Sequence, residues 1–188
     1  MTEPETADIE RLYQTHYRAV LRYLSRRTES SDTAADIAAE VFLVAWRRRS
    51  ELPWGRALPW LYRVAGYELA NRRRSARRAT AAYLRVGNDL ATQTSAEPAE
   101  LAEWSAELGD TLTALRELSG PDQEVLRLAA WEELHGKDLA VALGCSTTAA
   151  AMRLLRARRR LRAVLQESSV QGSSVVVTRQ PEQQGDHS

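Results

Sequence analysis

Hydrophobic residues recur every three or four positions along the first third of the chain, which is typical of helices with one buried face. The first run predicts a helix over about residues 7–27, on the stripe Ile9, Leu12, Tyr13, Tyr17, Val20, Leu21 and Leu24. Ser30, Ser31 and Asp32 offer turn and N-cap chemistry, and Thr33 followed by Asp36 resembles a capping box that opens a second helix. A third is predicted to begin near Pro59, a residue that the first helical turn tolerates. These three helices can share one core.

The second half of the chain shows the same periodicity after an interruption. The pattern weakens from about residue 79, and the Gly, Asn, Asp, Thr and Pro residues of 87–98 predict an interdomain linker. Further helices are predicted over 101–118, 122–133, 137–143 and 147–165, whereas the Ser, Gln and Gly residues of the tail predict disorder. The sequence therefore predicts an all-α protein of two small helical domains joined by a flexible linker.

Charge is distributed very unevenly, although the formal net charge of the 188 residues is only +1. Lys137 is the only lysine, so the basic side chains are almost all arginine. Five arginines lie within residues 72–78 and six within 153–162, while acidic residues gather near the N-terminus and over 97–110. Two local positive fields of this kind favour a nucleic-acid partner more than the total charge suggests.

Several classes of protein are disfavoured. The single cysteine, Cys145, excludes an internal disulfide and a multi-cysteine zinc site, and it is better interpreted as a small core residue than as a redox sensor. The three histidines lack metal-binding spacing, and there is no phosphate loop or nucleophile elbow. No apolar run or signal peptide is present. We therefore expect a cytoplasmic non-enzyme with no metal, cofactor or membrane insertion.

The joint between residues 143 and 147 is the most informative local feature. A helix-turn-helix needs a small residue where its helices cross and a glycine at the turn. Ala140 and Gly144 meet these needs, Leu139, Leu143, Cys145 and Ala150 can close the core, and Ser146 can cap the second helix. The arginines that follow would contact phosphates or bases. The alternative is an ordinary helical hairpin with a solvated basic face.

The stretch from Leu115 to Leu165 resembles domain four, the promoter-binding domain, of extracytoplasmic-function sigma factors. The resemblance rests on the leucine pair, the proline, the EVL helix, the LG.S turn and the RARRRLR ending. It implies that the last helix enters the major groove of the minus-thirty-five element. The implied readers are Thr147, Thr148, Arg153, Leu155 and Arg156. Ala151 stands where many members have lysine, so this chain lacks one common basic contact.

A second stretch, residues 36–49, reads DIAAEVFLVAWRRR and resembles the polymerase-binding helix of the same family. Physically it is an amphipathic helix with one face for its own core and another for a partner helix. The residues implied to bind core RNA polymerase are Asp36, Glu40, Val41, Phe42, Trp46 and Arg47. Without the resemblance, Phe42 and Trp46 would be assigned to the core.

A third stretch, residues 59–78, reads PWLYRVAGYELANRRRSARR and resembles the segment that melts the minus-ten element. Melting needs aromatic surfaces for unstacked bases and cations for the backbone. The implied minus-ten residues are Trp54, Trp60, Arg63, Tyr67, Asn71, Arg72, Arg73 and Arg74. Trp60 fits buried packing equally well, and Tyr67 stands where asparagine is common. The loop 52–58 is expected to help form a pocket for a flipped base.

Together the resemblance covers about residues 8–78 and 110–165. It implies sigma region 2 over 1–80, a linker over 81–100, sigma region 4 over 101–166 and a disordered tail over 167–188. The implied function is an alternative sigma factor that binds core RNA polymerase and promoter DNA to direct transcription initiation. An anti-sigma factor is implied as a further partner, because family members are commonly held inactive by one.

Two alternatives remain at the level of sequence. A stand-alone helix-turn-helix regulator would use its N-terminal helices for dimerisation and bind duplex DNA without polymerase. A helical adaptor that binds only another protein would leave both arginine clusters unexplained.

Overall fold

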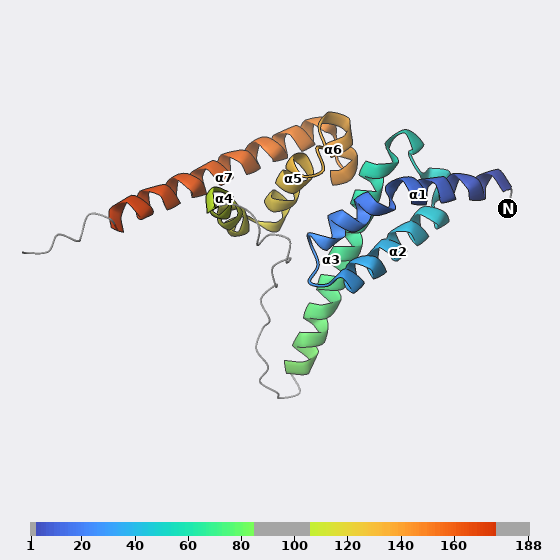
Figure 1. Cartoon of the computed structure of the whole chain (residues 1–188), viewed down its shortest axis with the longest axis horizontal. Helices are drawn as coiled ribbons and strands as arrows, with labels where there is room; N and C mark the ends of the chain where they lie inside the picture. The colour runs from blue at the N-terminus through green and yellow to red at the C-terminus, as the bar shows by residue number, and fades with distance from the viewer. Residues whose placement is uncertain (1–2, 85–105, 176–188) are drawn as a thin grey trace, which may run out of the picture.

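The computed structural model describes residues 3–84 and 106–175, and the regular structure in these ranges is entirely helical (Figure 1). The first domain contains α1 (Glu3–Ser25), α2 (Ser31–Arg47) and α3 (Ala57–Leu84). Two short 3₁₀ turns, η1 (Arg49–Glu51) and η2 (Trp54–Arg56), connect α2 to α3. The second domain contains α4 (Ala106–Glu117), α5 (Gly120–Ala130), α6 (Gly136–Leu143) and α7 (Thr147–Val175). The all-α prediction is confirmed.

The core of the first domain forms where α1, α2 and α3 bring their apolar stripes together. Val20, Leu24, Ile37, Val41 and Leu61 are at most 1% exposed. Full burial of each such side chain contributes about 1.5–3 kcal/mol of transfer free energy, which holds the three helices together. The predicted stripe of the first helix is confirmed in part: Tyr13 is 44% exposed instead of buried.

The start of α2 confirms the N-cap chemistry predicted at residues 30–32 but not the capping box. Ser30 is the N-cap, with an extended backbone (φ −141°, ψ 150°), and its Oγ accepts a hydrogen bond from the Thr33 N–H at 3.1 Å. The expected capping box at Thr33 and Asp36 is therefore wrong. Because Thr33 already lies in the first turn and its hydroxyl bonds the Ser30 side chain, the helix begins before the expected cap.

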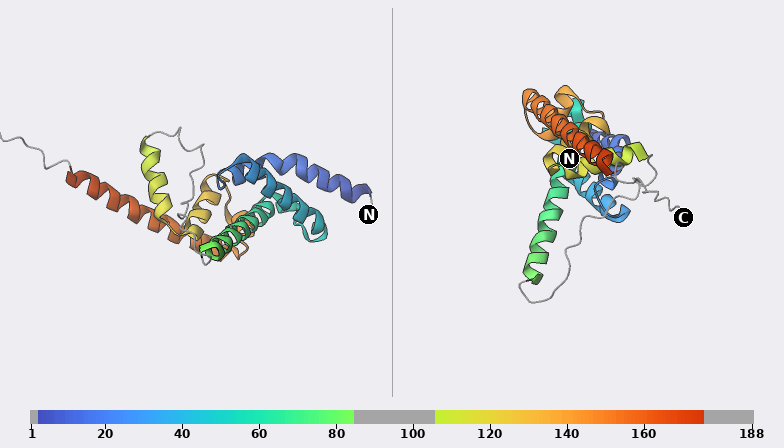
Figure 2. Two further views of the ribbon diagram at one scale, coloured as in Figure 1. Left: turned by 90° about the horizontal axis from the view of Figure 1, so that it is seen from below. Right: turned by 90° about the vertical axis from the view of Figure 1, so that its left-hand side faces the viewer.

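The third helix is longer than its apolar pattern. It begins at Ala57, two residues before Pro59, and continues to Leu84, so residues 81–84 are helical where the sequence predicted linker. Between Tyr67 and Leu84 there is no glycine or proline, and extending an existing helix by one residue costs far less than starting one. The C-terminal half of α3 projects away from the rest of the molecule, as Figure 1 and the right-hand view of Figure 2 show.

The second domain closes around α7. Its buried side chains come from every helix of the domain, and they include Leu115, Val125, Leu128, Leu139 and Ala157. Helix α7 extends to Val175, so residues 167–175 are helical where the sequence predicted a disordered tail. The same low cost of helix extension accounts for the difference. The predicted linker beyond residue 84, the helix start at Leu101 and Trp104, and the tail after residue 175 lie outside the described residues.

The two domains pack directly on one another. Helix α6 lies beside the N-terminal half of α3 (Figure 1), and the buried side chains of both domains form one continuous cluster. The sequence predicted two domains but not this junction. Its geometry determines where the candidate DNA-binding residues lie.

Candidate nucleic-acid interface and domain junction

The predicted helix-turn-helix is present. Helix α6 ends at Gly144, which adopts the left-handed conformation (φ +61°) that glycine tolerates best. The Cys145 N–H donates to the Ala140 carbonyl at 3.0 Å and the Gly144 N–H to the Val141 carbonyl at 3.1 Å, which is a Schellman motif. Ser146 then caps α7 by accepting from the Ala149 N–H at 3.2 Å. The two helices meet at 88°, close to the angle of DNA-binding helix-turn-helix units.

Helix α7 presents one face to its own domain and another to solvent. Ala150 and Ala157 are buried, whereas all five residues predicted to read the upstream element are exposed: Thr147, Thr148, Arg153, Leu155 and Arg156. Met152 also lies on the exposed face, with 42% of its surface accessible, and the sequence interpretation missed it. Its exposure could not be read from the sequence, because apolar residues occur on every side of the helix over residues 149–155.

Helix α2 divides the predicted polymerase-binding residues into two sets. Asp36, Glu40 and Arg47 are exposed. Val41 and Phe42 are 0% and 7% exposed and belong to the domain core, so their side chains are not available to a partner. Trp46 is half-buried, beneath the Arg49 guanidinium at 5.6 Å from its ring.

Leu43 was not predicted and belongs to the exposed side of α2. It is 40% exposed, three residues after Glu40 and four before Arg47, so these side chains share one face. An exposed leucine between charged residues is a mixed surface of the kind that binds a partner helix.

Helix α3 presents most of the predicted minus-ten residues on one surface. Arg63, Tyr67, Asn71 and Arg74 follow one another at three- and four-residue spacing and are all exposed, Tyr67 by 59%. The Arg74 guanidinium donates to Asn71 Oδ1 at 2.5 Å. The side chains therefore form a continuous strip with one aromatic ring between cationic and amide groups.

The neighbouring arginines of α3 have different surroundings. Arg72 forms an exposed ion pair with Asp36 at 3.7 Å, which joins α3 to α2. Arg73 donates to the carbonyl of Arg27 at 3.2 Å, so its guanidinium supports the turn after α1. Two members of this arginine cluster thus make contacts within the first domain, Arg72 at the surface and Arg73 on the backbone after α1.

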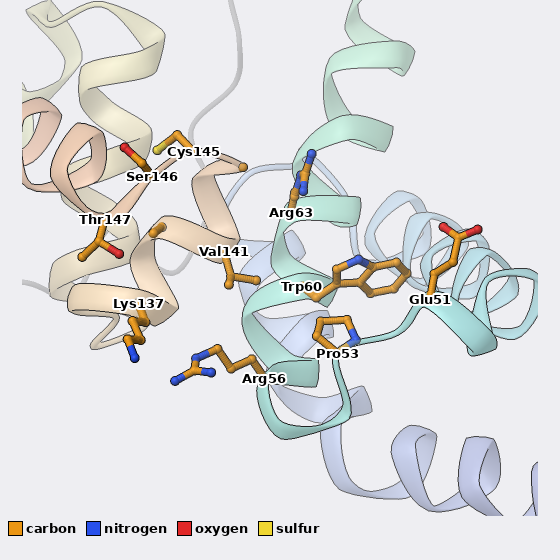
Figure 3. A pocket seen from close by; sticks show the side chains of 12 residues that line it. Glu51, Pro53, Arg56, Trp60, Arg63, Lys137, Val141, Cys145, Ser146 and Thr147 are labelled. Atoms are coloured by element: carbon orange, nitrogen blue, oxygen red, sulfur yellow. The ribbon is translucent and has the colours of Figure 1, made fainter.

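The two tryptophans of this region differ as well. Trp54, in η2, is 48% exposed and available for stacking. Trp60 is half-buried at the first turn of α3 and lies beside Pro53 in a cleft between the domains (Figure 3). Its ring is therefore shared between packing and an open surface.

This interdomain cleft has a volume of about 590 Å³. The first domain contributes Trp60, Arg56 and Arg63, and the second contributes Lys137, Val141 and Thr147 (Figure 3). The Arg63 side chain approaches the helix-turn-helix so closely that a Cβ on Gly144 would lie 2.7 Å from its Nε. A predicted minus-ten residue thus contacts the turn of the predicted minus-thirty-five module.

A second part of the junction is a buried ionic network around Arg27. The Arg27 Nε donates to Glu124 Oε2 at 3.1 Å, and its Nη1 lies 3.5 Å from Glu132 Oε1. The Tyr23 hydroxyl donates to Glu124 Oε1 at 2.8 Å. The Arg27 and Glu132 side chains are only 2% and 0% exposed. Arg27 and Tyr23 belong to the first domain and both glutamates to the second, so the network spans the junction.

Protonation in this network follows from burial and the two carboxylates. Burial alone would lower the pKa of Arg27, but Glu124, Tyr23 and Glu132 outweigh it and raise the pKa above its ordinary value. Burial, followed by the Glu132 carboxylate, raises the pKa of Tyr62 in α3. The guanidinium therefore stays charged and the phenol neutral at physiological pH.

An exposed ion pair lies elsewhere on the junction. Arg56 Nε and Asp138 Oδ1 are 2.9 Å apart, with side chains 44% and 49% exposed. This pair joins η2 to α6 and is accessible to solvent, unlike the Arg27 network. The junction therefore combines a buried ionic network with a solvent-exposed ion pair.

Within residues 3–84 and 106–175, no group of three His, Cys, Asp or Glu side chains could hold a metal ion. In the same ranges no single helix is both long and apolar enough to cross a membrane, although the bent pair α6 and α7 meets that test on length and composition alone.

Comparison with family models assigns both domains. Residues 12–79 match sigma-70 region 2 and residues 108–161 match sigma-70 region 4. The chain is 28% identical over 155 residues to the RNA polymerase sigma factor YlaC of Bacillus subtilis, covering 82% of this chain and 90% of that protein. It is 25% identical over 157 residues to the ECF RNA polymerase sigma factor SigM of the same organism, covering 83% and 94%.

The fold is also similar to a solved structure, that of the sigma factor RpoE in complex with the anti-sigma factor NepR from Bartonella quintana. The TM-score is 0.60 at 22% identity, over 85% of this chain and 97% of RpoE. Both family matches occur in one chain, in the order region 2 then region 4, and they fall on the two structural domains. The chain therefore belongs to the sigma-70 family and is an alternative sigma factor of the extracytoplasmic-function type, which acts in transcription initiation with core RNA polymerase and promoter DNA.

Proposed function

We propose that each of three exposed helical surfaces performs one step of promoter-specific initiation. The α2 face with Asp36, Glu40, Leu43 and Arg47 binds core RNA polymerase. The strip on α3, with Trp54 beside it, holds the melted minus-ten strand, and the exposed face of α7 reads the minus-thirty-five duplex. In this proposal the chain acts in the cytoplasm and has no catalytic centre of its own, since polymerase performs the chemistry.

The proposal is supported by a physical difference between the exposed surfaces of α3 and α7. The α3 strip places the exposed ring of Tyr67 among Arg63, Asn71 and Arg74, which suits stacking and backbone contacts to single-stranded DNA. Helix α7 follows a helix-turn-helix joint, which suits a duplex major groove. A stand-alone regulator would have use for the second surface but not the first.

The proposal requires the two domains to separate. The minus-ten and minus-thirty-five elements lie about 25 base pairs apart, or about 85 Å at 3.4 Å per base pair. Arg63 and Thr147, which are assigned to different elements, line the same cleft. Both cannot reach their elements while the junction is formed, so we propose that the packed arrangement is a resting form which opens on polymerase.

Run-off transcription with cognate core polymerase on a genomic DNA library tests the proposal. We expect promoter-specific transcripts only when the protein is added. Glu40→Ala with Leu43→Ala should reduce core binding, and Thr148→Ala should reduce promoter choice but leave core binding intact.

The absence of specific transcripts from a folded preparation would refute the assignment. Tight binding to duplex DNA without polymerase, together with inactivity in its presence, would instead favour the stand-alone regulator.

A further inference from the structure

The solvent-facing line of α7 contains two large apolar side chains. Thr148, Met152 and Leu155 follow at four- and three-residue spacing, opposite the buried line of Ala150 and Ala157. Met152 and Leu155 are each 42% exposed. Water contact with two long apolar side chains on one helix face indicates a surface that is covered in a complex.

The first two turns of α7 offer little hydrogen-bonding capacity for base edges. In a helix-turn-helix these are the turns that reach the bases. Their exposed side chains are two threonine hydroxyls, Ala151, Met152 and Arg153. Arg153 is rotated about 100° around the helix from Met152, toward the edge of the exposed face. The centre of that face is therefore apolar.

Charge identifies duplex DNA as the molecule that covers this surface. Between Thr147 and Gln166 there are six arginines and no acidic residue. Arg156 and Arg159 are exposed beside Leu155, so the apolar centre is bordered by cations that suit the phosphates along a groove. A neutral or basic protein helix would leave most of these charges unmatched, whereas the phosphates on both sides of a DNA groove pair with cations that border an apolar centre.

The major groove displays one apolar group, the C5 methyl of thymine. We propose that Met152 is a specificity residue that selects a T·A pair in the upstream element by packing its thioether side chain on this methyl group. The proposal rests on the proposed function of α7. Methionine is unbranched and polarizable, so it can follow the irregular floor of the groove.

The test removes the methyl group from the DNA instead of changing only the protein. Upstream elements are first selected from a randomised library by the holoenzyme, formed with wild-type protein or with Met152→Ala. A thymine that is preferred only by the wild type is then replaced by uracil, which lacks the methyl group and keeps every hydrogen-bonding group. Wild-type holoenzyme should bind the uracil promoter about fourfold more weakly. Met152→Ala should bind both promoters equally.

Two controls accompany the test. Met152→Leu keeps an apolar side chain and should retain most of the preference for thymine over uracil. A thymine-to-uracil change outside the upstream element should leave binding unaltered.

The outcomes separate this inference from the function on which it rests. No promoter-specific transcription by the wild type would overturn the proposed function. If the wild type transcribes specifically but shows no thymine preference that is lost in Met152→Ala, only the role of Met152 is overturned. The same follows if uracil weakens binding equally in the wild type and in Met152→Ala. Loss of core binding in Met152→Ala would also overturn it, because α7 would then be covered by protein.

Discussion

The Arg27 guanidinium and the Glu132 carboxylate face each other across the domain junction at 3.5 Å, although they are 105 residues apart in sequence. Neither side chain is more than 2% exposed. A buried ion pair adds little compared with apolar packing, but removal of one partner leaves a buried charge with fewer groups to stabilise it. The pair therefore makes the junction sensitive to a single change.

Glu132→Ala should open the junction, because Arg27 loses one of its two carboxylate partners. Loss of one member of a buried pair costs about 3 kcal/mol. Spin labels on cysteines placed at the exposed Gln14 and Arg162, in a Cys145→Ser background, report the distance between domains. We expect a shift to longer and broader distances. Glu117→Ala removes an exposed charge that forms no ion pair with Arg27 and should leave the distance between domains unaltered. An unaltered distance in Glu132→Ala would contradict the role of the pair.

Reversal of the charge at Arg56 or at Asp138 alone should weaken the domain junction, and reversal of both together should restore it. The pair is 2.9 Å apart but solvated, so either reversal should weaken the junction by only about 1 kcal/mol. The double variant Arg56→Glu with Asp138→Arg should return the label distance toward that of the wild type. The comparison is made at low and high salt, since an exposed pair is screened. Additive effects of the two reversals would show that they do not interact.

Gly144→Ala should disturb both the helix-turn-helix and the junction. Its φ of +61° costs a residue with a Cβ about 1–2 kcal/mol, and that Cβ would displace Arg63. Gly136→Ala is the matched control, because Gly136 has a φ of +52° and no atom near its Cβ position. Both variants should show a similar decrease in Tm. The distance between the spin labels on the two domains should change only for Gly144→Ala. A change of distance in both variants would exclude the Arg63 contact as its cause.

Stability of the second domain should decline in acid through Asp122. Its carboxylate accepts from Ser119 Oγ at 2.7 Å and from Arg160 Nη1 at 2.6 Å, and the pKa of Asp122 is consequently below its ordinary 3.8. Since the folded state has the lower pKa, this stabilisation is complete above pH 3.8 and is lost as pH falls through the folded-state value.

Ser119→Ala should raise the pKa of Asp122 in an NMR titration and cost about 1 kcal/mol from the lost helix cap. Ser119→Thr keeps the hydroxyl and should restore both the low pKa of Asp122 and the stability from the helix cap. A pKa of Asp122 that is equal in the Ser119→Ala and wild-type proteins would refute the hydrogen bond as its cause.

Alanine substitutions of the adjacent residues Arg73 and Arg74 should have different effects on stability. Arg74→Ala should reduce the dependence of DNA affinity on log salt by about 0.7–0.9 with no change in Tm, since its loss removes one phosphate contact. Arg73→Ala should in addition lower Tm, because Arg73 donates to the Arg27 carbonyl. Measurements of holoenzyme binding and of unfolding separate the two effects. An equal Tm for the two variants would contradict the structural role of Arg73.

Local sequence is sufficient to predict the helices, the helix-turn-helix joint and the charge pattern. Apolar spacing places Val20 and Leu61 in a core, because a helix repeats every 3.6 residues whatever it packs against. Gly144 and Ser146 determine a sharp turn through local backbone chemistry. These are interactions between near neighbours in the chain, and periodicity and residue type report them directly.

Which sides of those helices remain exposed depends on how the helices pack. Val41 and Phe42 became core while Leu43 and Met152 stayed exposed, because exposure depends on helices that arrive from elsewhere in the chain. The junction is the clearest case. Arg27 lies just after α1, and Glu124 and Glu132 lie in and just after α5. Nothing local distinguishes a charge that will be buried from one that will be solvated. Burial and pairing across about 100 residues arise only when the domains pack.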